Sequence, residues 1–213
     1  MELRLFRRDD EFTILLENTE LMSTRVSGSE QALATMTCQR LGRREGLQML
    51  IGGYGMGFTL RAALAVLNGD ASVTVAELVP EIIEWARGPM HALTDGCLDD
   101  PRVVLVGDDV AMLIEAAREA YDAILLDVDN GPEGLTRIEN DGLYSREGLY
   151  AALAALRPGG ILAVWSCDGD STFTARLLEA GFAVADVIVA EAEGQVDPDG
   201  AGARHVIWFA QKR

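Results

Sequence analysis

The chain has 213 residues, of which 49% are hydrophobic, and its formal net charge is −16. This length suits one well-buried domain and is short for two. Because 34 acidic residues stand against 18 basic ones, the chain repels a phosphate backbone and favours cationic ligands. We therefore expect no nucleic-acid partner.

The sequence predicts a cytoplasmic protein without a metal site. The N-terminus MELRLFRRDD is charged, and no apolar run approaches the roughly 20 residues of a membrane span, so we expect neither a signal peptide nor a membrane anchor. Cys38, Cys97 and Cys167 are widely spaced, which fits neither a disulfide framework nor paired zinc ligands. His91 and His205 have no cluster of ligand residues around them, which also argues against a metal.

Residues 1–28 predict a small β segment. The runs LRLFRR, FTILLE and LMSTRV are short, β-like and separated by turn-prone pairs, as in hairpins. Hairpins of this size are unstable alone, so we expect them to pair between subunits of a homodimer. A helix is predicted from Glu30 to Leu41, with Ser29 as its N-cap.

Residues 29–213 predict an α/β domain of the Rossmann-like methyltransferase type. Continuous apolar runs alternate with helical runs, which indicates a doubly wound, mostly parallel sheet. The Gly/Asp/Pro-rich connection 191–203 has no helical pattern, so the last two strands should form an antiparallel pair at the sheet edge. The predicted seven strands are 47–52, 72–78, 102–107, 121–128, 159–166, 182–190 and 205–211; the helices between them are 59–67, 80–87, 111–119, 146–156 and 171–180.

Ligands of such sheets bind beyond the carboxyl ends of the strands, and the first of these ends carries a glycine loop. A dinucleotide fingerprint fails here because Phe58 stands at its sixth position. The spacing G-x-G-x-G is instead the one expected for S-adenosylmethionine or a relative of it. The loop consists of Gly53, Tyr54, Gly55, Met56 and Gly57. Tyr54 and Met56 are candidate contacts to the sulfonium side of the ligand.

The second and third strand ends carry carboxylates. Glu77, followed by Leu78, can accept hydrogen bonds from both ribose hydroxyls of an adenosine group. Asp108 or Asp109 can accept from the adenine amine, with Asp108 preferred, or can cap the next helix instead. These ends therefore predict a nucleoside site.

The fourth and fifth strand ends are candidates for the reacting centre. Asp127 directly follows an apolar run and can hold an amine, take its proton or act as a general base. Asp129 and Asn130 are candidate substrate contacts, although Asp, Asn, Gly and Pro in series also make turns. Trp165 can line the acceptor cleft or pack in the core.

Several phrases together resemble the spermidine synthase (polyamine aminopropyltransferase) family, from about Leu50 to Trp165. They are GGYGMG, AELVPEIIEWAR, DDPRVVLVGDD, YDAILLDVDNGP and LYSREGLYAALAALRPGGILAV. The resemblance implies decarboxylated S-adenosylmethionine as aminopropyl donor and 5′-methylthioadenosine as by-product. It also implies roles for single residues: Glu77 would hold the ribose, Asp108 the adenine, Asp127 would deprotonate the attacking amine, and Tyr144 would form a pocket wall.

Three positions depart from the family pattern. The family loop is typically GGGDGG, and its Asp, which pairs with the donor's aminopropyl ammonium, is replaced by Gly55. The second Asp of the family's DxxD is Asn130, and SEQALATM stands where a Tyr-His-Glu phrase is usual. The nucleoside half of the site is thus kept and the amine half altered.

The leading hypothesis is transfer of an aminopropyl group from decarboxylated S-adenosylmethionine to a small amine. A methyltransferase that uses S-adenosylmethionine on a small molecule is the first alternative, because the loop Asp is missing. A non-catalytic nucleoside-binding protein is the second. The sequence does not name the acceptor.

Overall fold

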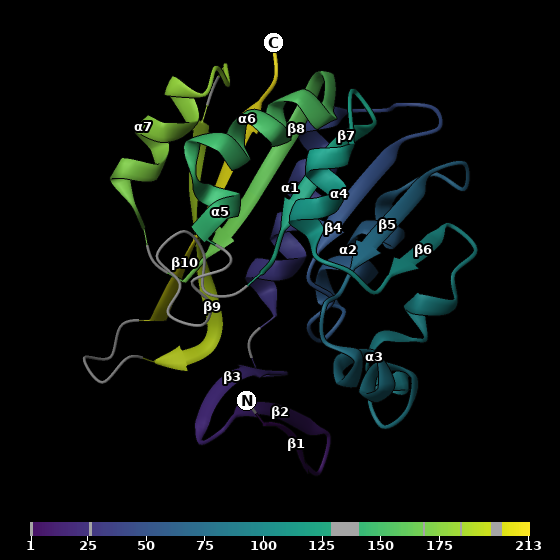
Figure 1. Ribbon diagram of the computed structural model, residues 1–213. Helices are drawn as coiled ribbons and strands as arrows, with labels where there is room; N and C mark the ends of the chain where they lie inside the picture. The colour runs from purple at the N-terminus through teal and green to yellow at the C-terminus, as the bar shows by residue number, and fades with distance from the viewer. Residues whose placement is uncertain (1, 26, 129–140, 168, 184, 197–201) are drawn as a thin grey trace.

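The computed structural model describes residues 2–25, 27–128, 141–167, 169–183, 185–196 and 202–213 (Figure 1). Its N-terminal part is an antiparallel sheet of three strands in the order β1-β2-β3, which confirms the predicted hairpins. The strands are β1 (Leu3–Arg8), β2 (Glu11–Leu16) and β3 (Thr19–Ser23).

The main sheet has seven strands in the order β6-β5-β4-β7-β8-β10-β9. β6, β5, β4, β7 and β8 are parallel, and β10 is antiparallel to both of its neighbours, as predicted for a methyltransferase-like fold. The last two strands extend further into the 191–203 connection than the sequence suggested. The strands are β4 (Gln48–Gly52), β5 (Ser72–Ala76), β6 (Val103–Val106), β7 (Tyr121–Leu126), β8 (Leu156–Ser166), β9 (Ala185–Val196) and β10 (Gly202–Gln211).

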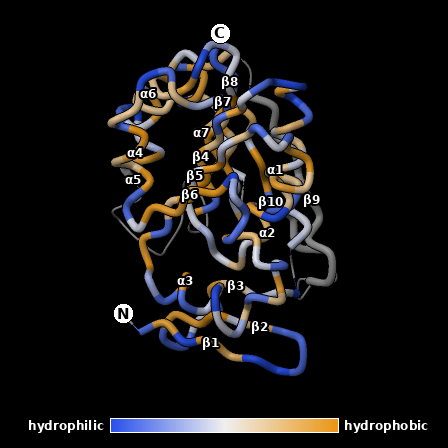
Figure 2. Tube along the Cα trace, turned by 90° about the vertical axis from the view of Figure 1, so that its right-hand side faces the viewer, coloured by the Kyte–Doolittle hydropathy of each residue, from blue (hydrophilic) through white to orange (hydrophobic). Residues whose placement is uncertain are grey.

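Helices cover both faces of this sheet, so its strands are apolar on both sides (Figure 2). In β4, Met49 and Ile51 pack into the core that α1, α2 and α3 share, whereas Leu50 packs into the core of α4, α6 and α7. The helices are α1 (Gly28–Leu41), α2 (Phe58–Val66), α3 (Pro80–Arg87), α4 (Val110–Ala116), α5 (Asp141–Tyr144), α6 (Arg146–Ala155) and α7 (Ser171–Glu179), with 3-10 helices at His91–Thr94 and Cys97–Asp99.

Helix α1 begins earlier than predicted, and Ser29 is not its N-cap. The helix starts at Gly28, Ser27 occupies the N-cap position, and no side chain caps it. Ser29 lies inside the first turn and is fully buried. Its hydroxyl is therefore directed to partners inside the fold and not to the free N–H groups of the helix end.

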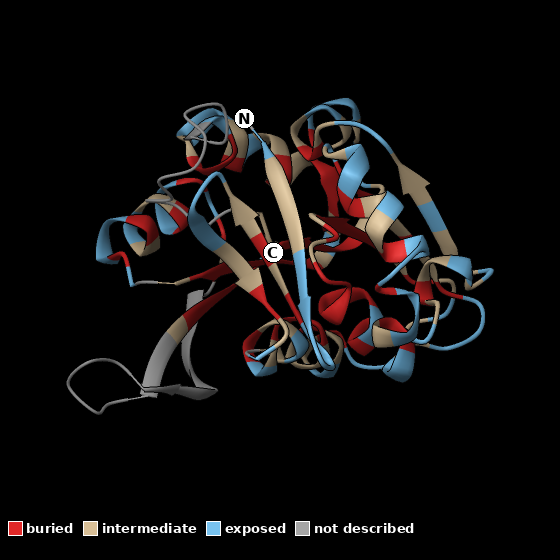
Figure 3. Cartoon of the chain, turned by 90° about the horizontal axis from the view of Figure 1, so that it is seen from below, coloured by how far each residue is buried: buried red, intermediate tan, exposed pale blue. Residues whose placement is uncertain are grey.

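The N-terminal sheet lies across the carboxyl edge of the parallel strands (Figure 1). Phe12 and Ile14 of β2 are buried in the core cluster that α1 and α2 also share, which fixes the small sheet to the domain. Seen from this side, the red buried strands lie behind the tan and blue N-terminal ribbon (Figure 3). Among the described residues, no helix is long and apolar enough to span a membrane.

Candidate functional site

A cavity of about 400 Å³ lies between the carboxyl ends of the parallel strands and the N-terminal sheet. This volume is typical of small-molecule sites. Six acidic side chains line it, and none of the described lining residues is Lys, Arg or His. The cavity therefore favours a cationic ligand. The acidic residues are Glu30, Glu77, Glu81, Asp108, Asp109 and Asp127, and the N-terminal sheet adds Leu3, Leu16, Leu21, Met22 and Ser23.

At two of the three glycines of the loop, neighbouring atoms of the protein leave no room for a side chain. A Cβ at Gly53, where φ is +83°, would overlap the carbonyl oxygen of Asp127. One at Gly57, where φ is +80°, would lie 2.6 Å from the Tyr54 hydroxyl oxygen. Gly55 is different, because its nearest neighbour would be the Met22 sulfur at 3.5 Å. Gly53 and Gly55 line the cavity, whereas Gly57 is required by the turn into α2.

Tyr54 lines the cavity, and its side chain holds the loop in place. Its ring is buried, and the hydroxyl oxygen lies 3.3 Å from the Thr94 hydroxyl and 3.7 Å from the Cys97 sulfur. Burial raises the pKa of the Tyr54 phenol, so the hydroxyl stays protonated. Met56 is buried as well and lines the cavity.

Glu77 follows β5 and is held by two main-chain donors. One carboxylate oxygen accepts from the Tyr54 N–H (2.9 Å) and the other from the Val79 N–H (2.8 Å). The residue is 8% exposed, yet it lines the cavity beside Leu78, which is 48% exposed. Each oxygen of a carboxylate can accept a second hydrogen bond, so Glu77 is suited to bind a pair of hydroxyls.

The two aspartates after β6 have different surroundings. Asp109 caps α4, since its carboxylate accepts from the Ala111 N–H at 2.8 Å. Asp108 is exposed and accepts from the N–H of Asp109 at 2.8 Å. Both line the cavity, but the capping alternative that the sequence left open applies to Asp109. Asp108 does not cap the helix and is the more exposed of the two.

Asp127 stands where β7 meets the glycine loop. Its N–H donates to the Gly52 carbonyl at 3.0 Å, and its carboxylate accepts from the Thr59 hydroxyl at 2.6 Å. Burial raises the pKa of Asp127 to about 6, while the hydrogen bond from Thr59 works in the opposite direction. The carboxyl group is therefore able to gain and lose a proton near neutral pH.

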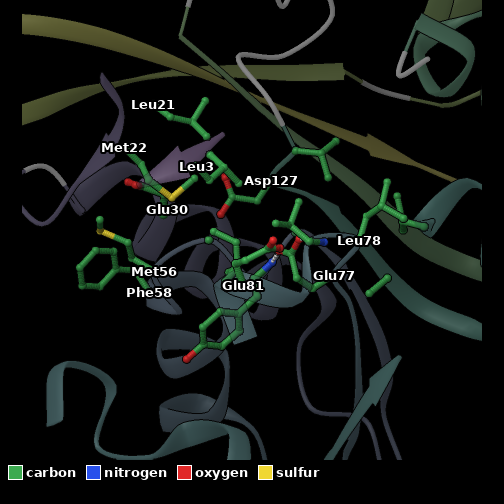
Figure 4. A pocket seen from close by; sticks show the side chains of 18 of the residues that line it. Leu3, Leu21, Met22, Glu30, Met56, Phe58, Glu77, Leu78, Glu81 and Asp127 are labelled. Carbon is green, nitrogen blue, oxygen red and sulfur yellow. Dashed lines mark hydrogen bonds between the residues drawn. The ribbon is translucent and has the colours of Figure 1, made fainter. Parts of the chain in front are cut away.

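A second carboxylate that the sequence did not single out lies beside Asp127. Burial, and then the negative charge of Asp127, raise the pKa of Glu30 in α1 to about 7, while a hydrogen bond from Ser29 works against this. Figure 4 shows Glu30 and Asp127 with Met22 and Leu3 near them. Two such acids titrate as a pair, because the ionisation of one disfavours that of the other. Glu30 lies in the segment SEQALATM, which was interpreted from the sequence only as a departure from the family pattern.

The cavity thus has two sides, which we name by their chemistry. The loop side consists of Gly53, Gly55, Met56, Glu77 and Asp108. The carboxylate side consists of Glu30, Asp127 and Trp165, together with the buried Thr59 that donates to Asp127. Trp165 lines the cavity, as the sequence allowed, and its indole N–H donates to the Ser29 hydroxyl at 3.0 Å.

The remaining candidates do not line the cavity in the described structure. Tyr144 is 2% exposed, packs edge-to-face on Phe173 and donates its hydroxyl to the Val128 carbonyl at 3.3 Å, so it lies behind the wall and not in it. Asp129 and Asn130 lie outside the described residues. Among the described residues, no group of three His, Cys, Asp or Glu side chains could hold a metal ion.

Comparison with known families assigns the chain. A family model described as "Spermine/spermidine synthase domain" matches residues 42–175, which is more than half of the chain. The chain belongs to this family. The resemblance drawn from the glycine loop and the strand ends is thereby confirmed.

Curated relatives match part of the chain and a smaller part of their own length. Polyamine aminopropyltransferase 2 of Pseudomonas aeruginosa is 34% identical over 128 residues, which are 58% of this chain and 34% of the relative. Putrescine N-methyltransferase 2 of Nicotiana attenuata is also 34% identical, over 54% of this chain and 29% of the relative. The chain spans about a third of the length of these relatives.

Solved structures share the fold over nearly the whole chain. Spermidine synthase from Thermotoga maritima superposes with a TM-score of 0.76 at 21% identity, and 99% of this chain matches 68% of that one. Spermidine synthase in complex with the transition-state analogue AdoDATO gives 0.75 at 20% identity, with the same coverage. A predicted O-methyltransferase from Agrobacterium tumefaciens gives 0.56 at 21% identity, over 86% of this chain and 80% of that one. The α/β methyltransferase-like fold is therefore shared by both classes.

Proposed function

We propose that this protein transfers an aminopropyl group from decarboxylated S-adenosylmethionine to a small cationic amine. The observation that carries the proposal is the pair Glu30 and Asp127, placed beside a glycine loop and a ribose-type carboxylate in a cavity lined by acidic groups. Family membership and the name of the Pseudomonas relative support the same reaction. The donor is both sulfonium and amine, so it too suits an acidic cavity.

The loop side would bind the adenosyl group of the donor. Glu77 is fixed by two main-chain N–H groups and keeps one free lone pair on each oxygen for the two ribose hydroxyls. Asp108 would accept from the adenine amine. Gly55 is open to the cavity and lets the ligand approach the main chain.

The carboxylate side would bind and deprotonate the acceptor. Because both pKa values are raised, Glu30 and Asp127 carry less than their full charge near neutral pH in the free protein. An ammonium ion placed between them favours the doubly ionised pair, so its binding expels a proton from the pair. Trp165 offers an aromatic wall that suits both an ammonium group and an alkyl chain.

Asp127 would act as the general base. It takes one proton from the ammonium nitrogen, and the freed lone pair attacks the donor carbon next to sulfur. The N–C bond forms as the S–C bond breaks, and the sulfur leaves as a neutral thioether. Because the sulfonium is already a good leaving group, the protein contributes mainly alignment and one proton transfer.

Methyl transfer from S-adenosylmethionine is the second candidate, and one local feature favours it. Gly55 stands where the family loop carries the Asp that pairs with the aminopropyl ammonium, and the neighbouring side chain is the uncharged Met22. The Nicotiana relative is named as an N-methyltransferase at the same identity as the aminopropyltransferase relative. The same carboxylate pair would then deprotonate an amine that attacks the methyl carbon.

Calorimetry with three ligands tests the proposal. We expect tighter binding of decarboxylated S-adenosylmethionine than of S-adenosylmethionine, and measurable binding of methylthioadenosine. Product analysis with a diamine should then show an aminopropylated amine. Tighter binding of S-adenosylmethionine together with a methylated product would establish the second candidate, and nucleoside binding without turnover of any amine would indicate a non-catalytic protein.

A further inference from the structure

The Ser29 hydroxyl joins the carboxylate side of the cavity to a histidine on another strand. It lies 3.0 Å from a carboxylate oxygen of Glu30 and 2.7 Å from Nδ1 of His205 in β10. The indole N–H of Trp165 donates to it at 3.0 Å. Ser29 is fully buried, whereas His205 is half-buried, and the indole and imidazole rings stack edge-to-face with centroids 4.8 Å apart.

Counting donors restricts where the protons of this cluster lie. A serine hydroxyl has one proton and can accept two hydrogen bonds, and an indole N–H can only donate. The Ser29 proton is therefore directed either to Glu30 or to His205, and not to both. The choice depends on the protonation of Glu30.

Two complete arrangements follow from this count. When Glu30 is a carboxylate, Ser29 donates to it, and His205 must donate from a protonated Nδ1. When Glu30 is protonated, it can donate to Ser29, whose own proton then points to an unprotonated Nδ1. These two arrangements differ by one proton moved along the Glu30–Ser29–His205 chain, which lies on Glu30 in one and on Nδ1 of His205 in the other.

We propose that His205 is the proton acceptor of Glu30, reached through the Ser29 hydroxyl. This inference rests on the proposed function, since it assigns the destination of the proton that an ammonium ion expels from the carboxylate pair. The proton leaves Glu30 for the Ser29 oxygen while the Ser29 proton passes to Nδ1 of His205. The products are a Glu30 carboxylate and a His205 imidazolium, and the reverse step restores both groups.

Ser29 and His205 are positioning residues in this scheme, because they act on the substrate through Glu30. The transfer leaves a full negative charge beside the incoming ammonium and moves the positive charge to the half-buried ring. The titratable groups that face Glu30 from the other elements of the cavity are acids, namely Asp127, Glu77, Glu81, Asp108 and Asp109. Among the described lining residues, none offers a basic nitrogen to receive the proton, whereas His205 does so through a single hydroxyl.

The tautomer of His205 tests the scheme without any ligand. The chain has two histidines, His91 and His205, so nitrogen-15 labelling of histidine gives two imidazole signals, and His91→Gln identifies the second. Titrated from about pH 5.5 to 8.5, His205 should place its proton on Nδ1 once Glu30 ionises. This pH-dependent change should disappear in Glu30→Gln. A His205 tautomer that is constant over this range, or a titration that Glu30→Gln leaves unchanged, would overturn the proposal.

Proton release on amine binding tests the same scheme in the working site. Calorimetry near pH 6 in buffers of different ionisation enthalpy counts the protons that putrescine, used as a probe amine, releases. His205→Asn keeps a donor for Ser29 but cannot take a proton, so the count should rise by up to about one proton per amine. Ser29→Ala, which cuts the link, should give the same rise. Equal counts in wild type and both variants would contradict the proposal.

These measurements separate this inference from the proposed function. If the wild type binds no amine but His205 changes tautomer with Glu30, the function fails and the proton link stands. If amine binds and is aminopropylated while the tautomer stays constant, the function stands and the proton link fails.

Discussion

The two sides of the cavity are built in different ways. On the loop side, each polar residue follows a parallel strand, and Glu77 is held by the main-chain N–H groups of Tyr54 and Val79. On the carboxylate side, Glu30 comes from α1, Thr59 from α2 and Asp127 from the end of β7, and side-chain hydrogen bonds hold them. Binding of the nucleoside should therefore depend on Glu77 and the main chain that holds it, whereas the reaction should depend on Asp127 and the side chains around it.

The largest expected effect comes from the base on the carboxylate side. Asp127→Asn removes the proton acceptor while keeping the size of the group and a possible partner for Thr59. We expect kcat to fall by about 10²–10⁴-fold, with the affinity for methylthioadenosine nearly unchanged. Glu84→Gln, the same kind of charge removal at an exposed site of α3, serves as control. A wild-type rate in Asp127→Asn would show that Asp127 is not the base.

On the loop side, Glu77→Gln should weaken the binding of the nucleoside. Its amide nitrogen would face one of the N–H donors that now point at the carboxylate, and the ribose hydroxyls would lose a charged acceptor. A charge-assisted hydrogen bond contributes about 1.5–3 kcal/mol, so we expect about 10–100-fold weaker binding of methylthioadenosine. The measurement is calorimetry at constant pH. Unchanged affinity would show that the nucleoside does not bind on the loop side of the cavity.

A substitution at the loop can test which donor the site prefers. Gly55→Asp restores the carboxylate of the family loop, and aspartate is one of the residues that tolerate the positive φ of +54° found there. We expect the preference for decarboxylated S-adenosylmethionine over S-adenosylmethionine to rise by about tenfold. Gly55→Asn has nearly the same shape without the charge and should leave the ratio unchanged. Equal ratios in both variants would mean that position 55 does not contact the donor tail.

The smallest expected effect concerns stability. The pKa of Glu30 is raised from 4.5 to about 7 in the folded chain, so its ionisation costs folding free energy. This cost is absent below about pH 4.5, grows as pH rises towards 7 and is complete above it. We therefore expect Glu30→Gln to raise the free energy of unfolding at pH 8 by about 1–3 kcal/mol, and to have little effect at pH 4.5. Urea unfolding at both pH values checks the sign, and destabilisation at pH 8 would contradict it.

The periodicity of the sequence was sufficient to predict the fold and the residues of the loop side. The strands are apolar on both faces, as in β4, where Met49 and Leu50 enter opposite cores, and this makes alternation with helices easy to recognise. Gly53, Glu77 and Asp108 each follow a strand, and a parallel sheet brings such ends to one edge whatever the details of packing. The sequence did misplace the start of α1, because a serine near a helix end is a typical N-cap and its buried partners lie far along the chain.

The carboxylate side was decided by the tertiary structure. Asp127 could be singled out from its position after an apolar run, but its partner Glu30 lies almost 100 residues earlier in a helix with no distinguishing pattern. Their raised pKa values depend on the depth at which α1 packs against the sheet, since both come first from burial. The sequence alone determines the hydrophobic periodicity of each segment and the positions at which the strands end. Contacts such as Ser29 with His205 exist because the folded layers place distant side chains within 2.7 Å of each other, a distance that no local pattern encodes.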